Sequence, residues 1–137
     1  MQTEEVRAFK NELRNYNFYL SSITSLDNSI EFCYYRLGGV RGIDPSKEPL
    51  HSPPDKDLEY QLRDKIEVLE AKKALLTNKI TYIEEILGRM ETSLREAVIK
   101  VYAQGKPISV VCNDLYVSPS GLAKKINKEI KKALTFL

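Results

Sequence analysis

The sequence has no tryptophan, one histidine and two cysteines among its 137 residues. Cys33 and Cys112 are far apart and fall on apolar helix faces, so we expect packed thiols and not a disulfide or metal pair. His51 lies in a proline-rich stretch, where a surface position fits better than a catalytic one. The sequence also has no phosphate-binding glycine loop and no Gly-x-Ser-x-Gly motif. We therefore expect neither an enzyme nor a bound metal or cofactor.

Long apolar runs are also missing, since no stretch of about 18 apolar residues occurs. The first residues, 1–5, lack the basic-then-apolar order of a secretory signal. We therefore expect a cytoplasmic protein that has no membrane partner. Hydrophobic residues make up 42% of the chain and charged residues 29%, which fits one all-α domain or two small ones.

The last third of the chain has the pattern of a helix-turn-helix. Two short apolar groups flank Gly105, and a brief connection at Tyr116 and Val117 leads to a lysine-rich helix. Ser118 can cap this helix and Pro119 suits its first position. One face is predicted to be buried and consists of Leu122, Ile126, Ile130 and Ala133. The opposite face carries Gly121, Lys124, Lys128, Lys131 and Lys132.

Charge is divided unequally along the chain. Residues 89–137 hold nine Lys and Arg against four Asp and Glu, a net charge of +5, whereas residues 1–88 hold 12 against 15, a net charge of −3. A cationic helix-turn-helix favours a polyanion, and duplex DNA offers phosphates that lysines can neutralise. A solvated basic face that binds nothing is the competing interpretation.

Two long amphipathic helices are predicted before this region. The first extends from about Thr3 to Arg36, with an apolar stripe that includes Leu13, Leu20 and Cys33. Residues 38–54, rich in glycine and proline, form a connector. The second helix begins near Asp57 and ends near Gly88. The helices can pair within one chain as a hairpin or coiled coil, or between subunits; a thin two-helix core favours self-association, with a dimer preferred.

A further helix is predicted between the long helices and the lysine-rich one. Ser93 and Glu96 have the spacing of a capping box, which places its start at Ser93, and Gly105 would end it. We therefore divide the chain into a long-helix domain, residues 1–88, and a DNA-binding domain, residues 89–137.

The chain resembles a known family at these same residues. Residues 94–108, the segment Val111–Leu115 and the approach to the basic helix from Val117 and Ser118 look like phage late-gene transcription regulators of the RinA and ArpU type. The C-terminal unit is similar to sigma-factor region 4. The resemblance covers roughly residues 36–134, and the first helix is matched in character alone.

The resemblance implies a phage or prophage activator that binds a promoter of packaging or structural genes in a bacterial host. Its recognition helix would open at Ser118, Pro119, Ser120 and Gly121. This opening departs from the family, which often has Arg, Gln, Glu or His here for reading bases. The candidate DNA contacts are Lys106, Ser118, Ser120, Gly121, Lys124, Lys125, Asn127, Lys128, Lys131 and Lys132, of which Ser120, Lys124 and Asn127 are placed for bases.

Two functions stay open at this point. In the first, the acidic helices dimerise or contact RNA polymerase while the basic end binds a promoter. In the second, the chain is a small-terminase-like packaging or assembly component whose helices build a ring. A pure interaction protein would bind no DNA.

Overall fold

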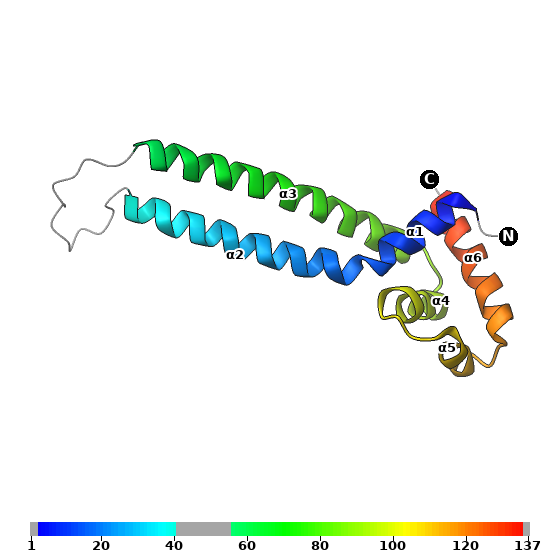
Figure 1. Cartoon of the computed structure of the whole chain (residues 1–137). Coiled ribbons are helices and arrows are strands. Elements are labelled where there is room, and N and C mark those ends of the chain that lie inside the picture. The colour runs from blue at the N-terminus through cyan, green and yellow to red at the C-terminus, as the bar shows by residue number, and fades with distance from the viewer. Residues whose placement is uncertain (1–2, 41–55, 136–137) are drawn as a thin grey trace. The chain divides into compact units, whose positions relative to one another are not determined.

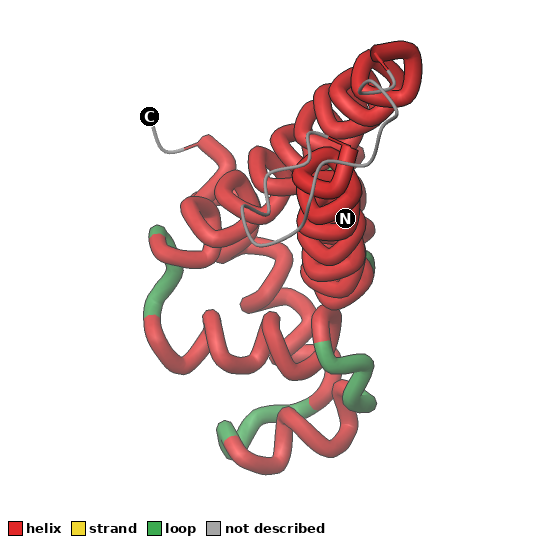
Figure 2. The backbone as a smooth tube through the Cα atoms, turned by 90° about the vertical axis from the view of Figure 1, so that its left-hand side faces the viewer, coloured by secondary structure: helices red, strands yellow, loops and turns green. Residues whose placement is uncertain are grey.

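The computed structural model describes residues 3–40 and 56–135. In these two ranges every regular element is a helix, which confirms the all-α class (Figure 2). None of these helices is both long enough and apolar enough to cross a bilayer. The elements labelled in Figure 1, with one π-helical turn, are α1 (Glu4–Arg14), α2 (Tyr16–Val40), α3 (Lys56–Gly88), α4 (Thr92–Val98), the π-helical turn (Ile99–Ala103), α5 (Ile108–Asp114) and α6 (Pro119–Thr135).

The chain divides into two compact units, and its two ends belong to the same one. The terminal unit contains the chain up to Leu20 and from Asn78 onward, and the central unit contains Ser21–Thr77. This differs from the predicted boundary after residue 88, because α1 packs against the π-helical turn and α6. The apolar face of α1 was visible in the sequence. Which distant helix covers that face cannot be read from periodicity within α1.

The single helix predicted from Thr3 to Arg36 is wrong, because α1 and α2 are separated at Asn15. Asn15 has φ −92° and ψ 0°, and its side-chain amide donates to the Asn11 carbonyl at 3.1 Å. Short amide side chains compete in this way with regular helical hydrogen bonding. After the break Tyr19 is 6% exposed and Leu20 41% exposed, so Tyr19 takes the inward position predicted for Leu20.

In the central unit, α2 and α3 lie side by side in opposite directions (Figure 1). Lys73 pairs with Asp27 at 2.6 Å, and the Tyr34 hydroxyl donates to Glu70 at 3.4 Å. Since the later residue of α2 contacts the earlier residue of α3, the helices run antiparallel. One cluster of buried side chains in this unit consists of Cys33, Leu37, Leu62 and Ile66.

The connector begins later than predicted. Helix α2 continues through Gly38 to Val40, and the described chain resumes with α3 at Lys56. Residues 38–40, which were predicted to belong to the connector, are therefore part of α2. The rest of the predicted connector, with His51, lies outside the described residues. Cys33 is buried in the central unit and Cys112 in the terminal unit, and both are free thiols, as predicted.

The start of α4 differs from the predicted capping box. Glu91, not Ser93, is the N-cap residue, and its carboxylate accepts from the backbone N–H groups of Ser93 and Leu94, each at 3.3 Å. The Ser93 hydroxyl also donates to this carboxylate. That hydrogen bond, with the two from the backbone, lowers the pKa of Glu91 below its usual value. Downstream, the chain leaves the π-helical turn at Gly105, whose φ of +72° agrees with its predicted role as terminator.

Arg95 closes the end of α3. Its guanidinium donates to the carbonyls of Leu87 at 2.8 Å and Met90 at 2.9 Å. The last carbonyls of a helix have no partner within the helix, so a planar group with several donors suits this position. Arg95 thereby joins α4 to the end of α3.

We predict that Arg95→Ala lowers the free energy of unfolding by about 2 kcal/mol, because it removes charged hydrogen bonds to two carbonyls. The Leu87 carbonyl then keeps the Met90 N–H as a partner, at 3.1 Å. Arg95→Lys should recover less than half of the loss, since an ammonium cannot present the same fork of donors. Urea denaturation followed by circular dichroism measures both. The control is Arg63→Ala, which breaks a surface pair with Glu59 of 3.1 Å and should cost about 0.5 kcal/mol or less. Equal losses at Arg95 and Arg63 would contradict the assigned role.

Candidate nucleic-acid interface

One face of α6 is buried in the terminal unit, as predicted. Helix α6 packs against α1, α4 and α5. The residues that make this face were the predicted ones and are almost completely shielded from solvent: Leu122, Ile126, Ile130 and Ala133. Contacts with three helices hold α6 in place and determine which of its faces stays accessible.

The beginning of α6 also agrees with the sequence. Pro119 is its first residue, and the Ser118 hydroxyl accepts a hydrogen bond from the Gly121 N–H at 3.0 Å. A Cβ atom at position 121 would lie 2.9 Å from this hydroxyl, so Gly121 makes room for the cap. The Ser118 and Ser120 hydroxyls are 3.5 Å apart. Three predicted contact residues are thus brought together at the start of the helix.

The lysines of α6 are all exposed. We call Lys124, Lys125, Lys128, Lys131 and Lys132 the lysine face. In the described part of the chain no carboxylate forms an ion pair with any of them. Their ammonium groups are thus available to a ligand from solution. Lys106, the remaining predicted cation, is exposed in the loop before α5.

Asn127 differs from the other predicted contacts because it faces α1. Lys10 of α1 is 4% exposed, and its ammonium donates to the Asn127 side-chain oxygen. The same ammonium lies 5.0 Å from the centre of the Tyr102 ring. Asn127 therefore helps to bury a cation, and we leave it out of the interface. Lys10 was not among the predicted residues, although its spacing from Val6 and Leu13 places it on the apolar face of α1.

Burial lowers the pKa of Lys10 from 10.5, and the charge of Arg14 lowers it further. Between this lowered pKa and the usual value the unfolded chain binds more protons, so this residue's contribution to stability rises with pH. We predict that the free energy of unfolding of the wild type increases relative to Lys10→Met as the pH rises toward 10.5, the usual pKa of lysine. Burial raises the pKa of Tyr102, but this tyrosine is present in both proteins. Urea titrations at several pH values measure the difference, and a constant difference would contradict the prediction.

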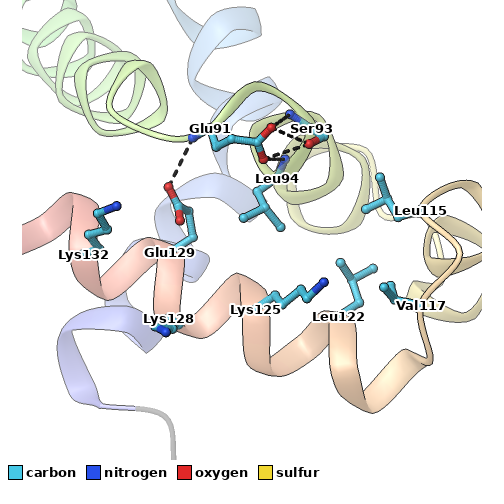
Figure 3. Close-up of a pocket in the computed structure, with 10 residues that line it drawn as sticks. All are labelled: Glu91, Ser93, Leu94, Leu115, Val117, Leu122, Lys125, Lys128, Glu129 and Lys132. Atoms are coloured by element: carbon cyan, nitrogen blue, oxygen red, sulfur yellow. Dashed lines mark hydrogen bonds between the residues drawn. The ribbon is translucent and has the colours of Figure 1, made fainter.

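A groove of about 500 Å³ runs between α4 and α6 (Figure 3). Apolar side chains line part of it, among them Leu94, Leu115 and Val117, and three members of the lysine face, Lys125, Lys128 and Lys132, line the α6 side. Its two carboxylates have structural roles: that of Glu91 caps α4, and that of Glu129 accepts from the Glu91 N–H at 3.2 Å. The ammonium groups are the charges left for a ligand.

The turn between α5 and α6 holds a strained residue. The Val117 N–H donates to the Cys112 carbonyl and the Tyr116 N–H to the Asn113 carbonyl, which is the Schellman pattern of helix termination. This pattern places Tyr116 in the left-handed region, with φ 56°. A non-glycine residue pays about 1 kcal/mol for this conformation. Nothing in the sequence pattern indicated it, because tyrosine is not typical of such positions.

The described residues bring no three His, Cys, Asp or Glu side chains together in a group that could hold a metal ion. The polar groups that α6 presents to solvent include the ammonium groups of the lysine face and the hydroxyl groups at its start. Comparison with known proteins adds no relative: the chain matches no protein-family model, and no curated protein or solved structure is significantly similar to it.

Proposed function

We propose that the chain binds double-stranded DNA, with α5 and α6 as a helix-turn-helix and α6 as the recognition helix. The observation that carries this proposal is the exposure of all five lysines of α6 while its opposite face is buried. Phosphates are the ligand that a row of unpaired ammonium groups fits best, because each contact releases condensed counterions. The capped start of α6 adds hydroxyl groups at the end of the helix that would enter the major groove.

The proposed contacts favour affinity over base discrimination. A lysine ammonium is a point charge without the planar geometry that reads a base edge. At the start of α6, Pro119 and Gly121 offer no polar side-chain group, and Ser120 is left as the hydroxyl suited to a base contact. With Asn127 engaged by Lys10, recognition would depend mainly on phosphates and DNA shape.

Within this class, we propose a transcription regulator that activates late genes of a phage in a bacterial cytoplasm. The resemblance of roughly residues 36–134 to regulators of the RinA and ArpU type supports this function, with RNA polymerase as a further partner. The aromatic side chains exposed on α2, including Phe32 at 59% and Tyr35 at 78%, support a homo-oligomer. In the alternative, a small-terminase-like packaging component, the same helices would close a ring.

Fluorescence anisotropy with a labelled duplex tests DNA binding directly. Five phosphate contacts predict a slope of about −4 to −5 for log K against log salt concentration. No binding at about 50 mM salt or below would overturn the proposal. The mass of the free protein in solution then separates the two functions: a dimer supports the regulator, and a closed ring of many subunits supports packaging.

A further inference from the structure

Tyr116 imposes a cost on the fold that another residue at the same position would avoid. The two hydrogen bonds that end α5 require a left-handed residue at position 116, and glycine adopts that conformation without strain. Tyrosine has a Cβ atom that opposes it, and its φ is 56°. Residues held in sparsely populated backbone regions tend to cluster at functional sites.

The Tyr116 side chain does not compensate for this strain by packing against the rest of the fold. The side chain is 96% exposed. Among the exposed large hydrophobic side chains of the described residues, this is the highest exposed fraction. Its neighbours Leu115 and Val117 are partly buried and line the groove between α4 and α6. The ring is therefore available to a molecule outside the chain.

The position of Tyr116 near the start of α6 favours DNA as the molecule that contacts its ring. Its Cα atom is two residues from Ser118, at most about 7 Å away along the chain. Ser118 caps the helix that carries the lysine face. If α6 enters the major groove as proposed, an exposed phenol next to its start would lie beside the groove edge, where the backbone phosphates are. Tyrosine hydroxyls commonly donate to phosphate oxygens.

We propose that Tyr116 is a DNA contact whose phenolic hydroxyl donates a hydrogen bond to a backbone phosphate beside the start of α6. This inference rests on the proposed DNA-binding function. Because the phenol is neutral, the contact adds affinity without releasing a counterion, and its removal should leave the salt dependence unchanged. The strain at position 116 is then the cost of presenting this hydroxyl.

Two substitutions separate the contact from the strain. Tyr116→Gly removes the ring and relieves the backbone, so the Tm should rise by about 3 °C while duplex affinity falls about tenfold. Tyr116→Phe keeps the ring and the strain, so the Tm should stay unchanged while affinity falls by a similar factor. A higher Tm together with a lower duplex affinity in Tyr116→Gly could not result from damage to the fold, because damage would lower both.

Anisotropy with one labelled duplex, at two salt concentrations, compares the wild type with both variants. Wild-type affinity in either variant would overturn the inference and leave the proposed function standing. If the variants instead lose subunit association while keeping DNA affinity, the ring contacts a second copy and the phosphate contact is wrong. A wild type that binds no duplex would overturn both proposals.

Discussion

Deleting residues 3–14 should unfold the terminal unit and abolish DNA binding, although no lysine of α6 is removed. Helix α1 contributes Val6, Phe9 and Leu13 to the core, and each of the three is at most 2% exposed. Burying each side chain stabilises the fold by about 1.5–3 kcal/mol. Together these contributions approach the total stability of an ordinary domain. Hydrogen exchange measures the effect, since the amides of α6 should lose their protection.

A single substitution in α1 gives a graded form of the same result. Leu13 is completely buried, so Leu13→Ala should lower the free energy of unfolding by about 3 kcal/mol through the cavity that it leaves. Leu75→Ala is the matched control, because Leu75 is 66% exposed and its truncation should cost about 0.5 kcal/mol or less. A C-terminal fragment that starts near Met90 and still protects its α6 amides would contradict the role of α1.

For the fold, the buried faces of single helices could be predicted from the sequence, whereas the helices that cover those faces could not. Periods of three and four residues identified the buried faces of α1 and α6 correctly, since those periods depend on one helix alone. The pairing of α1 with α6 involves residues more than 100 positions apart along the chain, and both helices present an apolar stripe that many partners could cover. The break at Asn15 was missed because a regular apolar spacing continues across it.

For the candidate interface, the local features were predictable and the interactions between distant side chains were not. The cap at Ser118 and the exposure of Lys124 and its neighbours follow from residue type and helical phase. The engagement of Asn127 by Lys10 could not be foreseen, because it depends on where α1 lies. The strain at Tyr116 follows from the backbone path between α5 and α6, which a tyrosine does not signal.

The proposed interface is thus held in position by the opposite end of the chain. Lys10 of α1 donates a hydrogen bond to Asn127 of α6, and α1 packs against α6. A charged face needs a fixed orientation to match a regular array of phosphates. These contacts make α1 a support for the proposed interface, although α1 carries none of the proposed DNA contacts itself.

Replacing Lys124, Lys128 and Lys131 together with alanine should weaken duplex binding about 100-fold at about 0.1 M salt, and make the salt slope shallower by about 2.7. All three ammonium groups are exposed on α6. Their removal therefore costs phosphate contacts and leaves the core intact. Circular dichroism should show unchanged helix content and a Tm close to that of the wild type.

The matched control for this variant replaces Lys56, Lys65 and Lys72 with alanine. These lysines are exposed on α3, and their loss changes the net charge by the same three units. Long-range attraction between protein and DNA depends on the net charge and falls equally in both triple variants, whereas the number of released counterions depends on local contacts. We therefore expect the α3 variant to keep the wild-type slope. Equal changes of slope in the two variants would show that the duplex does not bind on α6.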